Sequence, residues 1–431
     1  MANAPATTVR IDPVLKNEAN RVLDEIGISL SASITAFLKA VVREQGMPFE
    51  MRLTHSDQYI EPLRHCPGGN ASLNLAGVAK RDEFFTALSD IEAELPNYKT
   101  EFAGKSILCN CDDPFESNFF KFFVLHFNEY GLKKLVATCY GSSPVAGRDY
   151  PLEKMLPANH VGRGYKAVIT GIGDLVSSSS LNESTLRRLF SMPGNSIELL
   201  DGDGDFRSEE CLSLLDRADI VVTNPPFSLF REYLRTLVSY SKKFVIIGNI
   251  NAATYKEVFP LIKDNKVWFG ASIHSGDRKF YVPDSYPLRA AGCGVDSNGR
   301  KFIRVKGVRW FTNIDISQRH VGLPLTRSYS PADYPTFENY NAINVSRTKS
   351  IPADYPGIMG VPITFLDKYD PNQFEIIMLA NGNVSANTDE SLLRMVGYKR
   401  NPIDKGGVGI IDGKRTYARV LIRNRHPRRA V

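Results

Sequence analysis

The stretch that decides the fold runs from Asp219 to Phe227 and reads Asp-Ile-Val-Val-Thr-Asn-Pro-Pro-Phe. Its consecutive β-branched residues, 220–222, predict a strand that is buried on both faces. Pro225 and Pro226 cannot donate to a strand ladder, so the chain must turn away where this strand ends. In an open α/β sheet, that edge is where ligands bind. The stretch therefore predicts an α/β fold with a stiff polar loop, beginning at Asn224, at the ligand-binding edge of the sheet.

The side chains of this loop suit methylation of an exocyclic amine. The N6 nitrogen of adenine is a poor nucleophile because its lone pair is delocalised into the ring. The side-chain oxygen of Asn224 and the carbonyl of Pro225 can accept both N6 hydrogens, which draws the lone pair toward a sulfonium methyl group. Pro226 stiffens the loop in advance, and Phe227 can stack on a base flipped out of its duplex. The alternative is a Pro-Pro turn without chemistry, which the flanking strand and helix disfavour.

Residues 224–227 resemble the signature of the amino-methyltransferases, Asn/Asp/Ser-Pro-Pro-Tyr/Phe. The form with Asn and Phe favours adenine N6 over cytosine N4. Enzymes that methylate a protein glutamine or rRNA guanine share this signature. These four residues alone therefore leave the acceptor open.

Composition restricts the class of protein. A chain of 431 residues predicts two or three domains, and 43% hydrophobic with 23% charged residues is typical of a soluble globular protein. No apolar run is long enough to span a bilayer, and the six cysteines lack the spacing of a disulfide framework or a zinc site. We therefore expect a cytoplasmic protein with reduced cysteines and no membrane partner. The net charge of +6 permits nucleic-acid binding without requiring it.

Residues 1–53 predict a separate small module. Residues 8–12 alternate, with Thr8 and Arg10 on one face of a short strand, and two amphipathic helices follow. One strand and two helices cannot close a core alone. The pattern therefore predicts a homodimer in which two strands pair into a ribbon that fits a major groove, with Thr8 and Arg10 facing base edges.

The N-terminal segment resembles the RelB/DinJ antitoxin family of ribbon-helix-helix proteins. The match lies in Val9–Asp12, Gly27–Ser31 and Val42–Phe49. The toxin-binding tail of such proteins is absent, which indicates that the segment serves for dimerisation or for tethering to DNA. The alternative is a helical cap that has lost its DNA contacts.

Residues 54–275 predict a catalytic core in which strands and helices alternate as in a doubly wound sheet. A strand over 105–111 leads into the turn that contains Asp112, Asp113, Pro114 and Ser117, and a helix follows over 118–125. A strand, a tight turn and a helix start form the usual nucleotide or S-adenosylmethionine site. An acidic turn cannot cradle phosphate well but can hold the ammonium group of S-adenosylmethionine. Within the same core, residues 81–95 are expected to form a helix and residues 165–178 a hairpin.

The segment Gly204-Asp205-Phe206 supplies a second candidate cofactor contact. It resembles the methyltransferase motif in which a carboxylate accepts the adenine N6–H of the cofactor and the aromatic ring packs on its base. Alternating Asp and Gly over 201–205 also suggests calcium, but the Glu that closes an EF-hand loop is missing from its twelfth position. We expect no metal, because a sulfonium supplies its own electrophile.

Residues 276–431 predict a β-rich target-recognition region that binds DNA. Cations alternate with aromatics there, as on surfaces that contact phosphates and fill the space of a flipped base. The residues concerned include Arg278, Lys279, Phe280, Tyr281, Arg300, Lys301, Arg304, Lys306, Arg309 and Trp310. A β-rich domain with solvated charges is the alternative.

The order of these motifs resembles the EcoRI-type adenine-specific DNA methyltransferases over residues 102–374, with further matches at 308–313 and 360–369. The resemblance implies a Rossmann-like methyltransferase core, S-adenosylmethionine as donor and adenine in double-stranded DNA as acceptor, as in restriction-modification. It places Asn224, Pro225, Pro226 and Phe227 in catalysis. The expected cofactor contacts are Asp112, Asp113, Pro114 and Ser117 at the methionine part, and Asp205 and Phe206 at the adenine. Two other hypotheses stay open, a methyltransferase for rRNA or protein glutamine and a non-enzymatic antitoxin-like repressor.

Overall fold

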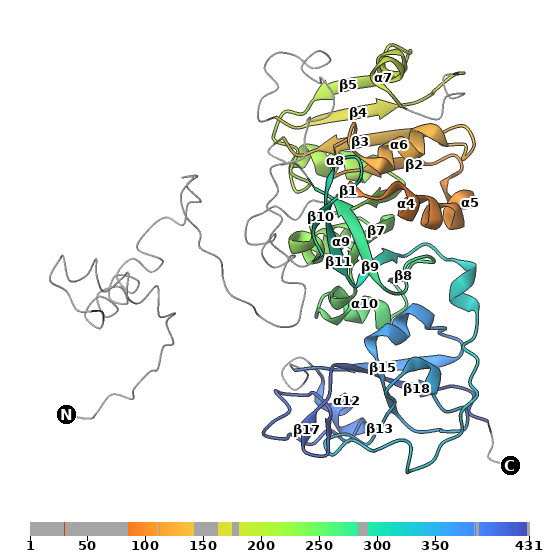
Figure 1. Cartoon of the computed structure of the whole chain (residues 1–431), viewed down its shortest axis with the longest axis vertical. Helices are drawn as coiled ribbons and strands as arrows, with labels where there is room; N and C mark the ends of the chain where they lie inside the picture. The colour runs from red at the N-terminus through yellow and green to blue at the C-terminus, as the bar shows by residue number, and fades with distance from the viewer. Residues whose placement is uncertain are drawn as a thin grey trace. The chain divides into compact units, whose positions relative to one another are not determined.

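The computed structural model describes residues 30, 85–111, 113–141, 163–174, 181–282, 292–382, 384 and 388–428. The chain divides into two compact units, Met1–Cys66 and Pro67–Val431. The ribbon-helix-helix module expected over residues 1–53, with Thr8 and Arg10, lies outside the described residues, apart from Leu30. Asp112 lies outside them as well. The fold described below is that of the second unit (Figure 1).

An eight-stranded sheet lies at the centre of this unit, with the strand order β5-β4-β3-β2-β6-β7-β12-β8. Strands β2, β3, β6 and β7 are parallel, whereas β4 and β12 run antiparallel to both of their neighbours. Figure 1 shows the first four strands of this order side by side. The bounds are β2 (Ser106–Cys109), β3 (Lys134–Cys139), β4 (Tyr165–Ile169), β5 (Ser196–Leu199), β6 (Ile220–Thr223), β7 (Lys243–Asn249), β8 (Trp268–Phe269) and β12 (Val308–Thr312).

The strand order reverses between β2 and β6. The chain leaves β2 for β3 on one side, and leaves β6 for β7 on the other. The loops after β2 and β6 therefore diverge at the carboxyl edge of the sheet, which creates the crevice in which α/β proteins bind ligands. This topology confirms the predicted α/β fold with a Rossmann-like methyltransferase core.

Helices cover both faces of the sheet because its strand residues alternate between two hydrophobic clusters. Ile107, Leu135 and Ile220 face one cluster, whereas their neighbours Leu108, Val136 and Val221 face the other. The first face is covered by α4 (Leu88–Glu94), α5 (Lys99–Phe102), α6 (Asn118–Leu125) and α7 (Glu183–Phe190). The second is covered by α8 (Glu209–Arg217), α9 (Phe230–Ser239) and α10 (Phe259–Lys263).

The structure differs from the sequence-based expectations in two places. The first strand of the hairpin expected over 165–178, residues 165–169, is instead the sheet strand β4, which pairs with β3 on one side and β5 on the other. Its residues Tyr165, Ala167 and Ile169 are buried, which a strand inside a sheet explains. A helix expected over 81–95 begins only at Leu88, because residues 85–86 pair with β9 instead. Both differences arise from pairings with distant segments.

A smaller sheet, which we call the arm, has the order β1-β9-β11-β10. Its strands are β1 (Phe85–Thr86), β9 (Asp277–Tyr281), β10 (Gly294–Val295) and β11 (Lys301–Lys306). The chain then returns to the central sheet as β12, beyond residue 275. A third sheet, β13-β14-β18-β15, contains β13 (Ile343–Asn344), β14 (Met359–Pro362), β15 (Phe374–Ala380) and β18 (Arg419–Asn424).

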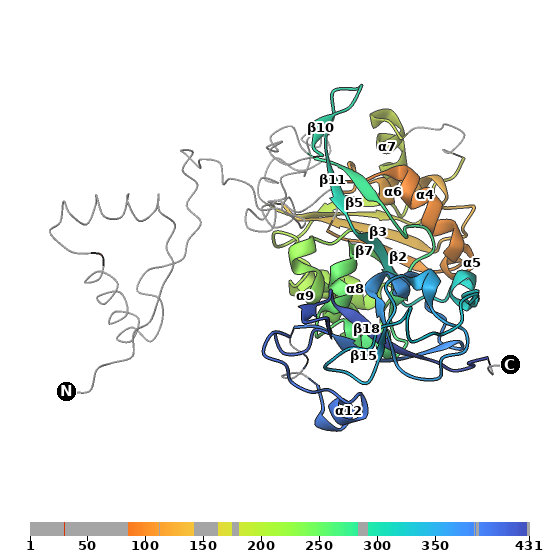
Figure 2. The ribbon, with the colours of Figure 1, turned by 60° about the horizontal axis from the view of Figure 1, so that its bottom comes forward.

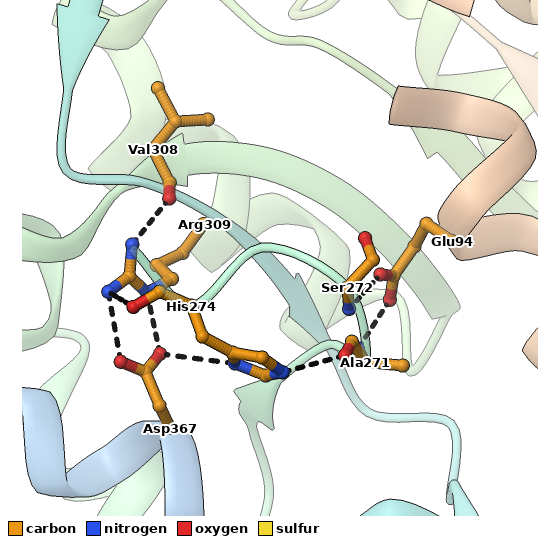
Figure 3. A network of polar contacts seen from close by, with 7 residues as sticks. All are labelled: Glu94, Ala271, Ser272, His274, Val308, Arg309 and Asp367. Atoms are coloured by element: carbon orange, nitrogen blue, oxygen red, sulfur yellow. Dashed lines mark hydrogen bonds and ion pairs between the residues drawn. The ribbon is translucent and has the colours of Figure 1, made fainter. Parts of the chain in front are cut away.

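A buried ion pair fastens the C-terminal region to the central sheet (Figure 3). Arg309 on β12 donates to both carboxylate oxygens of Asp367, at 2.5 and 2.9 Å, and both side chains are 4% exposed. Arg309 also donates to the carbonyls of Val308 and His274. The hydrogen bond to Asp367 raises the pKa of His274 above its usual value. Asp367 thus fixes both β12 and the loop that follows β8.

Replacing Asp367 by alanine is expected to destabilise the protein strongly, because Arg309 keeps its charge but loses its partner. The loss of one member of a buried ion pair costs about 3–5 kcal/mol. The midpoint of urea unfolding measures it. Glu390→Ala is the matched control, since the Glu390–Arg394 pair is 89% and 80% exposed and its loss should leave the midpoint unchanged. Equal midpoints for the two variants would contradict a structural role for the Arg309–Asp367 pair.

Candidate active site

Asn224 lies where the strand order reverses. All four residues of β6 are buried, and Asn224 follows them with only 5% exposure. Pro225 and Pro226 then carry the chain into a 3-10 turn, η3 (Phe227–Leu229), which continues into α9. The backbone N–H of Leu229 donates to the carbonyl of Pro226 at 3.0 Å. The loop is therefore held by a strand on one side and a helix on the other, as its prolines predict.

Asn110 connects the loop after β2 to the loop after β6. It is 4% exposed and follows β2 as Asn224 follows β6. Its backbone carbonyl accepts a hydrogen bond from the hydroxyl of Thr223, and its side-chain oxygen accepts one from Tyr233 on α9. Burial raises the pKa of Tyr233 well above its usual value, so this hydroxyl stays a donor. Asn110 thus ties together the ends of two strands and a helix.

Asp113 and Ser117, which lie between β2 and α6, shape the loop that contains them. Asp113 is 1% exposed, and its carboxylate accepts from the Tyr165 hydroxyl at 2.6 Å and from the Phe115 amide at 2.8 Å. Ser117 caps α6, because its hydroxyl oxygen accepts from the amides of Phe119 and Phe120. These contacts hold the turn between β2 and α6 in one conformation. Pro114 lies inside this turn.

Gly204 allows the acidic loop over 201–205 to reach the end of β3. Its φ of +82° is unfavourable for other residues, and a Cβ there would overlap the carbonyl oxygen of Cys139. The amide of Gly141 donates to the carbonyl of Asp203 at 2.6 Å, which joins the same two segments. This packing brings Asp205 and Phe206 to the carboxyl edge of the sheet.

Asp205 and Phe206 have different surroundings. The Asp205 carboxylate pairs with Arg207 at 2.5 Å and 2.9 Å, and this hydrogen bonding lowers the pKa of Asp205. Phe206 is 7% exposed and packs edge-on against Tyr233, with ring centroids 5.1 Å apart. Phe206 therefore touches the same tyrosine that binds Asn110. Asp205 instead faces outward with Arg207.

Phe227 lies against the arm. Its ring is half-buried and meets Phe280 of β9 edge-on, with centroids 6.2 Å apart. The arm is also anchored on the other side of the crevice, because the Asn118 side chain at the start of α6 donates to the carbonyl of Thr86 on β1 at 2.6 Å. The arm thus adjoins both loops of the candidate site.

Sequence reasoning did not identify Asn110, Tyr165 or Tyr233 as site residues, and it assigned Phe280, which is only 1% exposed, to a DNA-contacting surface. Asn110 ends a strand that the sequence predicts, but only the strand order of the sheet places it beside the strand of Asn224. Tyr233 stands three residues after Phe230 on the buried face of a helix, which looks like ordinary packing. The remaining two are recognisable only through their partners, Asp113 and Phe227.

Two cavities occur elsewhere in the described part of the chain. One of about 610 Å³ lies between α10 and β15, and one of about 320 Å³ lies beside His274 and Asp367. Neither is lined by Asn224.

Among the described residues, no three His, Cys, Asp or Glu side chains are grouped so as to hold a metal ion. Within the same residues, no helix has the length and apolar character needed to cross a membrane.

Two family models match the chain in separate segments. The model described as adenine-specific methyltransferase EcoRI matches residues 72–425. The model described as RelB antitoxin matches residues 6–72. Both resemblances seen in the sequence are thereby confirmed. No solved structure matches the chain.

Curated relatives match along nearly their whole length. The chain is 44% identical over 365 residues to the type II methyltransferase M.EcoRI of Escherichia coli, covering 83% of this chain and 97% of the relative. It is 35% identical over 362 residues to the type II methyltransferase M.MpnI of Mycoplasma pneumoniae, covering 82% and 98%. A type II methyltransferase of Mycoplasma genitalium is 34% identical over 357 residues, covering 81% and 98%. The chain therefore belongs to the adenine-specific methyltransferase EcoRI family and is a methyltransferase that carries a RelB-like segment at its N-terminus.

Proposed function

We propose that this protein transfers a methyl group from S-adenosylmethionine to the N6 nitrogen of one adenine in a short double-stranded DNA site. The observation that carries the proposal is the position of Asn224, buried at the point where the strand order reverses, in a chain of the adenine-specific family. The relatives are named type II methyltransferases, which supports action on DNA within restriction-modification. We place this activity in the cytoplasm.

On the acceptor side, Asn224 and Pro225 orient the amine. The Asn224 side-chain oxygen and the Pro225 carbonyl accept its two hydrogens, so the N6 lone pair turns out of the ring plane toward the methyl group. Pro226 keeps the loop in this geometry before the substrate arrives, which avoids reorganisation during the reaction. Phe227 stacks on the flipped adenine, and its contact with Phe280 limits the positions that its ring can take.

On the cofactor side, the donor set suits S-adenosylmethionine. The cofactor supplies an electrophilic methyl group on a cationic sulfonium, and the crevice edge offers carboxylates and aromatic rings. Asp113 and Ser117 shape the loop that contacts the methionine part of the cofactor. Asp112 and Pro114 belong to the same loop in the sequence and contact the same part of the cofactor. Asp205 accepts from the adenine amino group of the cofactor while Arg207 keeps it ionised, and Phe206 packs at the base. No metal takes part.

The domain organisation forms part of the proposal. Residues 1–53 form a ribbon-helix-helix module, 54–275 the catalytic core with β12 completing its sheet, and 276–431 the target-recognition region. The module pairs two chains into a homodimer and tethers them to DNA through Thr8 and Arg10. Support comes from the RelB model over residues 6–72, ahead of the methyltransferase match that begins at residue 72.

Methyl transfer from labelled S-adenosylmethionine to unmethylated plasmid DNA, followed by mapping of the modified base, tests the proposal. We expect N6-methyladenine in one short motif. Asn224→Ala should lower kcat by about 10²–10³-fold or more while the cofactor affinity, measured by calorimetry, stays unchanged. Asn251→Ala is the matched control, because this exposed asparagine follows the neighbouring strand β7. Label that appears only in rRNA or protein would assign the acceptor to those polymers.

Phe227 can be tested by separating its stacking from its packing. Stacking of a base on an aromatic ring contributes about 1–3 kcal/mol. Phe227→Leu keeps an apolar contact with Phe280 but loses the stacking face, so we expect kcat/KM for DNA to fall about 5- to 150-fold. Phe227→Trp should retain most of the activity. An unchanged kcat/KM in the leucine variant would show that the base does not stack there.

Sedimentation of the full chain and of a chain lacking residues 1–53 tests the N-terminal module. We expect the full chain to sediment as a dimer and the shortened chain as a monomer. The shortened chain should still methylate the same motif, because the family match lies in residues 72–425. Dimers of both proteins, or a monomeric full chain, would contradict the proposed pairing.

A further inference from the structure

The outward face of the arm combines cations with aromatic rings in a regular pattern. Residues two apart along a strand lie on the same face, as do residues directly opposite one another. Tyr281 lies opposite Phe302, and Lys279 lies opposite Arg304. These four side chains therefore share one face. The intervening residues Phe280, Ile303 and Val305 are buried in the core, so the arm has one anchored face and one exposed face.

The cations of this face are stacked on its aromatic rings. Lys279 lies 4.1 Å from the ring centroid of Phe302, and Arg300 lies 4.1 Å from that of Tyr281. Arg304 lies 6.0 Å from Phe302. Contacts of this kind restrict long side chains that would otherwise lose more entropy on binding. The side chains of Arg300 and Arg304 are nevertheless 57% and 50% exposed, so their charges remain accessible.

Carboxylates only partly neutralise the face. Asp296 lies 3.5 Å from Arg300 and 3.9 Å from Lys279, and Asp277 lies 3.4 Å from Arg304. Lys306 is a further exposed cation on the same face, opposite Asp277. Among the residues of this face that the structure describes, four cations are therefore balanced by only two carboxylates. A surface with this excess, whose cations are already ordered, matches a polyanion.

The position of the arm beside the candidate site indicates which polyanion would bind there. Its buried face contacts Phe227 of the candidate site through Phe280, and β1 is joined to the start of α6. Figure 2 shows the end of the arm at β10 extending beyond the central sheet. A ligand that reaches the crevice with one nucleotide can lay its neighbouring backbone along this face. We propose that the outward face of the arm, formed by Lys279, Tyr281, Arg300, Phe302 and Arg304, docks the phosphate backbone of the duplex beside the flipped adenine. This inference rests on the proposed function.

The inference is tested by measuring, at several salt concentrations, how tightly the protein binds a labelled DNA duplex that carries the motif it methylates. Each lost phosphate contact lowers the slope of log K against log salt by about 0.9, so Arg300→Ala with Arg304→Ala should lower it by about 1.8. The DNA Kd at low salt should rise at least about tenfold, with an unchanged affinity for S-adenosylmethionine. The variant with both Arg300→Lys and Arg304→Lys should retain the wild-type slope, since it keeps both positive charges.

The matched control is Lys105→Ala with Lys133→Ala. Both lysines are exposed and precede β2 and β3, so they lie at the opposite edge of the sheet from Asn224. This variant should bind DNA as the wild type does. A wild-type slope in the arginine-to-alanine variant, with DNA methylation intact, would overturn the inference but leave the proposed function standing. A slope that changes only for duplex RNA also overturns it, and a wild-type protein that binds no DNA overturns both.

Discussion

The hydrogen bonds made by Asn110 are the constraint on which the candidate site depends. Its carbonyl accepts a hydrogen bond from the Thr223 hydroxyl, its side-chain oxygen accepts one from the Tyr233 hydroxyl, and all three residues are buried. A buried polar group that loses its partner costs about 1–3 kcal/mol, so the three elements resist separation. Because Asn224 directly follows Thr223, its position relative to the loop after β2 is set before any ligand binds. The ring of Phe206 packs on Tyr233, which extends the same restraint to the loop over 201–205.

The acidic residues at this edge have different physical roles. Asp113 is buried and uses its oxygens on Tyr165 and on backbone amides, so its carboxylate maintains the shape of a loop. Asp205 is partly exposed and is kept ionised by Arg207, so it retains a charged surface toward solvent. A carboxylate accepts several hydrogen bonds at once, which allows Asp205 to bind Arg207 and a ligand amine together. The environment, and not the residue type, distinguishes the two.

The connection from core to C-terminal region passes through the arm. After β8 the chain leaves the central sheet, forms β9 to β11 and returns as β12 between β7 and β8. Phe280 contacts Phe227 on the way out, and Arg309 binds Asp367 after the return. A shift of the arm would therefore disturb both the candidate stacking ring and the strand that supports the C-terminal region. This geometry would connect the proposed docking of DNA on the arm directly to the candidate site.

Local patterns in the sequence determined the strand before Asn224, the stop imposed by two prolines, and the helix over residues 118–125, whose bounds the structure reproduces. Such features depend on neighbouring residues: apolar runs, missing N–H groups and a serine cap. The strand pairing of residues 165–169 and the roles of Asn110 and Tyr233 required the tertiary structure. Thr223 and Tyr233 meet Asn110 across 113 and 123 residues of chain, and no local pattern specifies which buried polar groups will become partners. The tertiary structure decided those contacts because the packing of the sheet brings the ends of β2 and β6 together.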